Sequence, residues 1–161
     1  MTLLLQLLWL AIPVIASGLV HLVVLKLDLL PGLRVLPIDG GVTFRGKRVF
    51  GDNKTWRGAL VTITTMTVTA WVLAQMHACC WHLPTPVPFA ETHPIAWGLL
   101  LGCGYIAGEL PNSFCKRQIG IGPGKGGEGI TGRICWVVDQ LDSLAGMLVF
   151  TWPVWQPPLA L

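Results

Sequence analysis

The chain has 161 residues, of which 53% are hydrophobic and only 12% are charged, and its formal net charge is +3. Its mean hydropathy is +0.64, and it contains eight tryptophans. This composition exceeds what a soluble domain carries, and the length allows one domain only. A soluble enzyme is therefore excluded, and we predict that residues 1–161 form a single all-α integral membrane domain.

Four apolar segments are long enough to cross a bilayer, because about 20 helical residues rising ~1.5 Å each cover ~30 Å of hydrocarbon. The second segment contains "LVTITTMTVTAW", whose Thr and Val content favours a strand by propensity. A lone strand would leave its backbone groups unsatisfied in lipid, so we predict a helix there as well. The four expected spans are about 3–29, 58–81, 94–116 and 134–155.

The basic residues of the loops predict the orientation of the chain. Loops 30–57 and 117–133, with their flanking residues, hold Arg34, Arg45, Lys47, Arg48, Lys54, Arg57, Lys116, Arg117, Lys125 and Arg133. The connection 82–93 has no Lys or Arg. By the positive-inside rule both basic loops are cytoplasmic, and the two termini face outward from the inner membrane. No basic residue precedes the first apolar run and no A-x-A site follows it, so we expect an uncleaved first span.

The first basic loop ends in "FGDNKTWRG", directly before the second span. Lys54 offers a point charge and Arg57 a bidentate fork, and both suit phosphate oxygens. Anchoring of the span end by interfacial cations is the competing interpretation, which we prefer for Arg45, Lys47 and Arg48.

Polar residues gather at the cytoplasmic end of the third span. Glu109, Asn112, Ser113 and Lys116 recur at i, i+3, i+4 and i+7, which aligns them on one helical face. Lys116 and Arg117 then stand at the boundary where phosphate-bearing headgroups lie. This end of the third span is therefore a candidate anion site.

The glycine-rich segment 120–132 follows this face. Small residues let backbone N–H groups approach a phosphate chain closely, and Lys125 adds a cation. The segment matches G-x-G-x-x-G, but no strand precedes it, and Gly126 follows Lys125 where a P-loop needs Ser or Thr. A plain flexible loop remains the alternative.

Asp139 and Asp142 lie three residues apart, so on a helix they share one face. Two carboxylates at the end of a membrane span are costly unless they are compensated. Oxygen-only ligation favours a hard cation, and Mg²⁺ usually takes one or two carboxylates together with substrate phosphates. Salt bridges to loop arginines would also compensate these carboxylates. The histidines, among them His21, are expected to be structural residues in or beside the outward parts of the spans.

The ordered motifs "GDNKTWRG", "GELPNSFCKRQIGIGPGK" and "VVDQLDS" resemble the CDP-archaeol synthase family, which is related to the CDP-diacylglycerol synthases. The resemblance implies a membrane cytidylyltransferase that joins CTP to a lipid phosphate with Mg²⁺ as cofactor, releases pyrophosphate and needs no nucleic acid. It implies substrate binding by Lys54, Arg57, Ser113, Lys116 and Arg117, and a metal site that contains Asp139 and Asp142. We expect catalytic roles for Lys116, Asp139 and Asp142. From the residues themselves we add Lys125 to the substrate-binding set and Glu109 to the metal site.

Two features depart from the family pattern. Glu109 stands where the pattern more often has Asp, and similar members usually have another membrane span after the fourth. A homodimer is one way to enclose the site. Two other functions use the same cations: an anion transporter or channel subunit, and a non-catalytic protein that binds anionic lipids. The second explains the cations but not the paired aspartates.

Overall fold

The computed structural model describes residues 3–79, 85–87, 89 and 91–156, and most of them are helical. The elements are α1 (Leu3–Lys26), α2 (Pro31–Arg34), β1 (Thr43–Phe44), β2 (Lys47–Arg48), α3 (Trp56–Cys79), α4 (Pro94–Gln118) and α5 (Gly129–Thr151). The strands β1 and β2 form a short antiparallel hairpin that the sequence did not indicate. Apart from this hairpin, the prediction of a helical protein is confirmed.

Three of the described helices, α1, α3 and α5, are long and apolar enough to cross a membrane. The chain is therefore a multi-pass membrane protein, as predicted. Helix α4 is 25 residues long, but its glycines and its polar second half lower its hydropathy. The count of four spans stays a prediction for this helix, and Trp81, the expected end of the second span, lies outside the described residues.

Helix α5 begins at Gly129, earlier than the predicted 134. Its first turn is closed by a 3.1 Å hydrogen bond from the Gly132 amide to the Glu128 carbonyl. Glycine disfavours helix, so the glycines at 129 and 132 did not predict that the helix begins here. The glycine-rich loop is therefore shorter than expected, and it spans residues 119–128 between α4 and α5.

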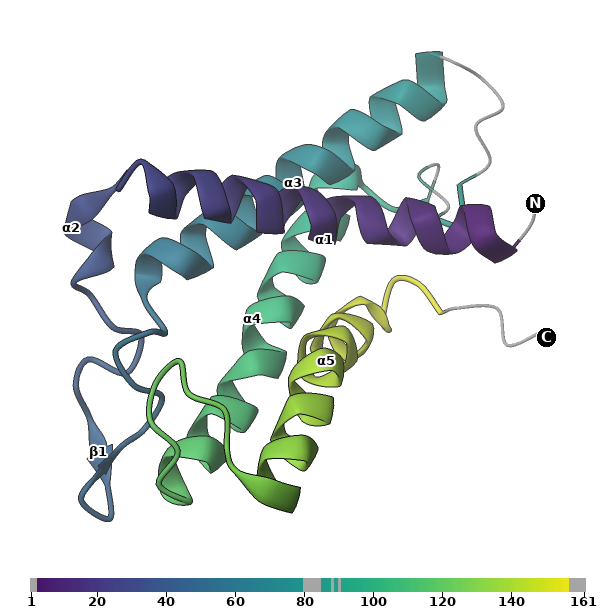
Figure 1. Ribbon diagram of the computed structural model, residues 1–161. Helices are drawn as coiled ribbons and strands as arrows, with labels where there is room; N and C mark the ends of the chain where they lie inside the picture. Colours follow the sequence, from purple (N-terminus) through teal and green to yellow (C-terminus); the bar gives the residue numbers. More distant parts are fainter. Residues whose placement is uncertain (1–2, 80–84, 88, 90, 157–161) are drawn as a thin grey trace.

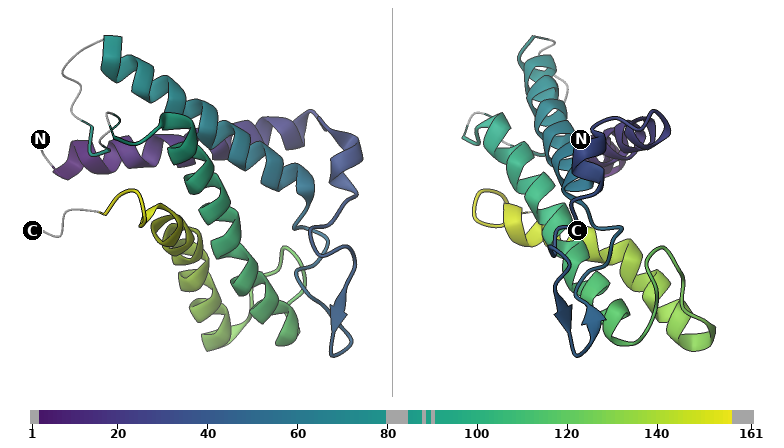
Figure 2. Two further views of the ribbon diagram at one scale, coloured as in Figure 1. Left: turned by 180° about the vertical axis from the view of Figure 1, so that it is seen from behind. Right: turned by 90° about the vertical axis from the view of Figure 1, so that its left-hand side faces the viewer.

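Helix α4 is the centre of the bundle, with α3 packed on one side and α5 on the other, while α1 packs on α3 (Figure 1). Figure 2 shows from two further directions that α4 and α5 lie side by side. The buried core contains residues of α3, α4 and α5 and one residue of the connection between α3 and α4. It consists of Met66, Ala70, Val87, Trp97, Leu101 and Met147.

Glycines set how closely α4 approaches its neighbours. A Cβ atom at Gly98 would lie 2.4 Å from the nearest α3 backbone atom, and Gly102 is equally tight against α3. On the other side, a Cβ atom at Gly108 would lie 2.1 Å from the carbonyl oxygen of Asp142, with Gly146 of α5 alongside. Small residues allow backbones in membrane proteins to meet in this way. The Gly108 contact holds Asp142 beside the polar end of α4.

The β1–β2 hairpin and the 119–128 loop gather at the end of the molecule where α4 ends and α5 begins (Figures 1 and 2). Two contacts hold the hairpin there: the Phe44 and Phe114 rings lie 5.7 Å apart, and the Lys47 ammonium donates to the Gln118 carbonyl over 2.6 Å. Both basic loops therefore lie at the same end of the bundle, over the polar residues of α4 and α5.

Candidate active site

A polar cleft of about 370 Å³ opens between the segment that precedes α3, the last turns of α4, the 119–128 loop and α5. Eight of the nine residues predicted to form the site line it: Lys54, Glu109, Ser113, Lys116, Arg117, Lys125, Asp139 and Asp142. The lining also includes Asn53, Asn112, Gly124 and Gly126. The structure thus brings together three sequence motifs that are far apart along the chain.

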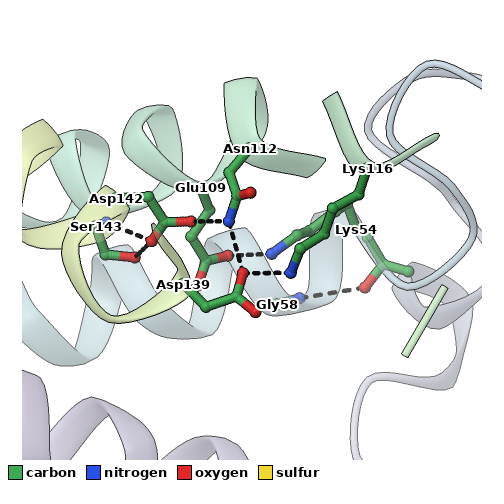
Figure 3. Close-up of polar contacts among 9 residues, drawn as sticks. Lys54, Gly58, Glu109, Asn112, Lys116, Asp139, Asp142 and Ser143 are labelled. Carbon is green, nitrogen blue, oxygen red and sulfur yellow. Dashed lines mark hydrogen bonds and ion pairs between the residues drawn. The ribbon is translucent and has the colours of Figure 1, made fainter. Parts of the chain in front are cut away.

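Asp139 and Asp142 of α5 converge on one side chain of α4. The Asn112 amide nitrogen donates to Asp139 Oδ1 and to Asp142 Oδ2, over 2.6 Å in each case (Figure 3). The second oxygen of Asp142 accepts a 2.5 Å hydrogen bond from the Ser143 amide and a 3.0 Å bond from its hydroxyl. The i, i+3 spacing therefore places both carboxylates on one face, as the sequence predicted.

The lysines of the cleft are paired with its carboxylates. Lys116 forms an ion pair with Asp139, and Lys54 forms one with Glu109 (Figure 3). Within the described part of the chain, no group of three or more His, Cys, Asp or Glu is arranged to hold a metal. The structure therefore pairs Glu109 with a lysine, and its role as a metal ligand stays a prediction.

The donor set of the aspartates fits a hard cation. Asp139 Oδ1 and Asp142 Oδ2 both lie 2.6 Å from one amide nitrogen, so these oxygens point to a common position. The Asn112 amide nitrogen bridges the two carboxylates at that position. Two carboxylates are ligands that Mg²⁺ accepts, together with phosphate oxygens.

Arg117 is a buried cation without a protein partner for most of its guanidinium. The residue is 7% exposed, and its Nε and Nη1 atoms make no hydrogen bond within the described structure. Burying an unpaired charge costs several kcal/mol unless a partner compensates it, and that order of magnitude makes an empty arrangement unfavourable. Because Arg117 lines the cleft, its positive charge favours the binding of an anion there.

Arg57 is the one predicted site residue that does not line the cleft. Its side chain is 8% exposed, and Nη1 pairs with Asp28 Oδ1 at 2.8 Å. The same nitrogen donates to the Leu29 carbonyl over 3.3 Å. Arg57 therefore joins the start of α3 to the turn after α1, which gives it a structural contact that its sequence motif did not indicate.

An apolar groove of about 560 Å³ adjoins the polar cleft. Its walls are α1, α3 and α4, and it shares Asn53, Lys54 and Glu109 with the cleft. His21 lines this groove, close enough to Gly58 that a Cβ atom there would lie 3.2 Å from His21 Cε1. This histidine, expected in an outward part of its span, therefore lies at the end of α1 that adjoins the site.

Sequence reasoning missed Asn53 as a member of the site, and it placed Asn112 on the polar face of the candidate anion site without giving it a role. Asn112 was on the predicted polar face of α4, between Glu109 and Lys116, so its helical spacing was a usable signal. Asn53 precedes Lys54 in the same motif, but nothing in a loop sequence tells which neighbouring side chain faces the cleft.

The family model for CarS-like CDP-archaeol synthases matches residues 1–160. The chain belongs to the CDP-archaeol synthase family. The resemblance drawn from the three motifs is therefore confirmed. CDP-archaeol synthases from Pyrococcus furiosus and Methanosphaerula palustris are each 33% identical to it, over 73% and 70% of this chain. The relative from Methanospirillum hungatei is 35% identical over 74% of this chain and 67% of its own length.

The matches cover 62% of the Pyrococcus protein and 61% of the Methanosphaerula protein, so the chain spans about three fifths of these relatives. A solved structure, described as "Structural insight into an intramembrane enzyme for archaeal membrane lipids biosynthesis", superposes with a TM-score of 0.62. The alignment is 22% identical and covers 95% of this chain and 82% of the other. At that identity the likeness shows a shared fold, which is the helical membrane fold described above.

Proposed function

We propose that this member of the CDP-archaeol synthase family transfers the cytidylyl group of CTP to a lipid phosphate and releases pyrophosphate. The observation that carries this proposal is the buried guanidinium of Arg117. Its Nε and Nη1 atoms have no hydrogen-bond partner among the described residues, and Arg117 lines the same cleft as two converging aspartates. An anion of high charge density that binds with a divalent cation satisfies both features. A nucleoside triphosphate is such an anion, and the names of the relatives point to a CDP-activated lipid as product.

The cations of the cleft are suited to hold the phosphates of the nucleotide. Lys116 and Lys54 present ammonium groups from two different elements, Arg117 presents a fork, and Lys125 adds a charge from the 119–128 loop. Asp139 and Asp142 would hold Mg²⁺, which when bound neutralises phosphate charge as it develops. The ion pairs of Lys54 and Lys116 keep these side chains extended into the cleft before substrate binds.

The lipid substrate is proposed to reach the cleft from the apolar groove, because groove and cleft share Lys54 and Glu109. One oxygen of the lipid phosphate attacks the α-phosphorus of CTP and forms the new P–O bond. The bond from the α-phosphorus to the oxygen that bridges to the β-phosphate breaks, and pyrophosphate leaves with its electron pair. A phosphate is already an anion near neutral pH, so the residues need to position and stabilise charge, and no general base is required.

The proposed orientation follows from the loops. Both basic loops lie at the cleft end of the bundle (Figure 1), and the positive-inside rule puts such loops in the cytoplasm, where CTP is available. We propose that the protein lies in the inner membrane with the cleft facing the cytoplasm. Enclosure of the site by a second copy stays a prediction.

The test is pyrophosphate release by the purified protein in lipid, with Mg²⁺, each of the four nucleoside triphosphates, and either an acyl or an isoprenoid ether-lipid phosphate. CTP-specific release with one of the two lipids is expected. Release without lipid, or with all nucleotides equally, contradicts a cytidylyltransferase. Ion flux in proteoliposomes without turnover would instead support an anion channel.

A further inference from the structure

Asp39 lies in the first loop, outside the cleft, and its carboxylate is enclosed by donors. Its side chain is 1% exposed. Oδ1 accepts hydrogen bonds from Arg48 Nη2 at 2.6 Å and from the Gly41 amide at 3.0 Å. Oδ2 accepts from the Phe50 amide at 2.8 Å and from the Gly51 amide at 3.0 Å. One buried carboxylate thus holds both the hairpin and the turn that follows it.

This turn forms one wall of the polar cleft. The Gly51 carbonyl accepts a 3.2 Å hydrogen bond from the Lys54 amide, and the Lys54 carbonyl accepts a 2.7 Å bond from the Ile38 amide. The backbone of Lys54 is therefore fixed on both sides, by the turn that Asp39 holds and by the residue that precedes Asp39. Lys54 reaches from this wall to Glu109.

The same turn also touches the opposite wall. Gly51 has a φ of +95°, and a Cβ atom there would lie 3.1 Å from Pro123 Cγ and 3.4 Å from Arg117 Cδ. The turn therefore packs against the 119–128 loop and against the stem of the unpaired arginine. A positive φ and this close approach together require glycine at position 51.

We propose that Asp39 is a positioning residue for nucleotide binding, which holds Lys54 and Arg117 in the geometry that receives the phosphates. This role rests on the proposed function. Asp39 does not line the cleft, so it acts through the 50–54 turn. Its loss lowers the affinity for the nucleotide more than the affinity for the lipid, because the groove takes only its edge from this turn and most of its lining from α1, α3 and α4. The paired aspartates of α5 stay in place.

The ionised state of Asp39 is built into this arrangement. Burial raises the pKa of the carboxyl, but the hydrogen bonds from Arg48 and from the Phe50, Gly51 and Gly41 amides outweigh it, and the pKa lies well below the usual range. An Asp39→Asn substitution keeps the volume but replaces an acceptor oxygen by an NH₂ group that faces these donors. The substitution therefore removes hydrogen bonds that hold the 50–54 turn without creating a cavity.

Asp52 provides a matched control. It pairs with the other end of the same Arg48 guanidinium, but its side chain is 77% exposed. Exposed ion pairs contribute little to stability, so Asp52→Asn should leave the turn in place. A third variant, Gly51→Ala, disturbs the same turn from the side of Arg117 and Pro123.

The experiment compares the wild type with these three variants in three ways: steady-state kinetics with CTP and lipid phosphate, amide hydrogen exchange of residues 50–54, and equilibrium binding of pyrophosphate. For Asp39→Asn and Gly51→Ala we expect the KM for CTP to rise about tenfold, because a tenfold loss of affinity matches about one lost charge-assisted hydrogen bond. The kcat and the KM for lipid should stay within about twofold of the wild-type values. Exchange at 50–54 should be faster and pyrophosphate binding weaker, while Asp52→Asn behaves as the wild type.

Three results overturn the proposal: unchanged exchange at 50–54 in Asp39→Asn, faster exchange with an unchanged KM for CTP, or equal rises in both KM values. If the wild type shows no turnover with CTP, the proposed function fails. Amide hydrogen exchange at residues 50–54 and pyrophosphate binding then decide whether Asp39 positions the turn that carries Lys54. Unchanged pyrophosphate binding in Asp39→Asn would overturn that role as well.

Discussion

Gly108→Ala tests how the close contact of α4 and α5 positions the site. The added Cβ atom would lie 2.1 Å from the Asp142 carbonyl oxygen, whereas ordinary contacts between such atoms are about 3.5 Å. The two helices must therefore separate by about 1.4 Å to restore an ordinary contact, and Asp139 and Asp142 move with α5. A shift of ~1 Å in a reacting group can cost about 100-fold in rate. Overpacking also costs ~1–3 kcal/mol of stability.

The assay is CDP-lipid formation per mole of folded protein, with thermal unfolding in lipid measured in parallel. Gly98→Ala is the matched control, because its Cβ atom would lie 2.4 Å from α3, about 15 Å along α4 from Gly108. We expect both variants to be destabilised, but only Gly108→Ala to lose about 100-fold in turnover. Wild-type turnover in Gly108→Ala, or an equal loss in Gly98→Ala, would refute the reasoning.

Three further predictions concern the charges of the site. Arg117→Met removes a buried charge whose Nε and Nη1 have no hydrogen-bond partner in the described part of the chain. The thermal midpoint should therefore stay equal or rise, while the KM for CTP rises more than about tenfold. A large fall of the midpoint would show that Arg117 is paired within the protein. Burial raises the pKa of Asp39, but the hydrogen bonds from Arg48 and from backbone amides lower it more, so the pKa is lower in the folded than in the unfolded protein. The ionised carboxylate therefore contributes its full stability above the unfolded pKa of about 3.9, and this contribution is lost as the pH falls from there towards the folded pKa. The difference in stability between wild type and Asp39→Asn should therefore be constant from about pH 8 to 5 and shrink below about pH 4, and a difference that grows with acidity would contradict this assignment. Removal of divalent cations with a chelator should abolish turnover and added Mg²⁺ should restore it, whereas turnover in the chelator alone would exclude a metal held by Asp139 and Asp142.

The sequence predicted the parts of the site that depend on short-range geometry. The i, i+3, i+4 and i+7 spacing from Glu109 to Lys116 and the i, i+3 spacing of Asp139 and Asp142 need only a helix to place each set on one face. Helices are expected in these segments because, in lipid, the backbone N–H and C=O groups must bond to one another within the segment. These six positions could therefore be found without knowing how the helices pack.

Contacts between distant segments could not be predicted in this way. Asp28 and Arg57 are 29 residues apart, and neither sequence segment indicates that they pair. Arg57 therefore has a contact with the turn after α1 that the sequence did not indicate, and its role in phosphate binding stays a prediction. The enclosure of Asp39 depends on the hairpin, whose two-residue strands give too little alternation to be recognised. The glycines were a partial exception: the pairs Gly98–Gly102 and Gly104–Gly108 have the small-xxx-small spacing of close helix contacts, which their sequence already displays.

The central claim is that the polar cleft is the site of cytidylyl transfer. It is tested most directly by mass-spectrometric measurement of the CDP-lipid formed from CTP and a lipid phosphate with Mg²⁺, in the wild type, in Asp142→Asn and in Asp52→Asn. The account predicts product from the wild type and from the exposed Asp52→Asn variant at rates within about twofold, and a loss of more than about 100-fold in Asp142→Asn with unchanged membrane insertion. Product formed by Asp142→Asn at the wild-type rate would contradict the account.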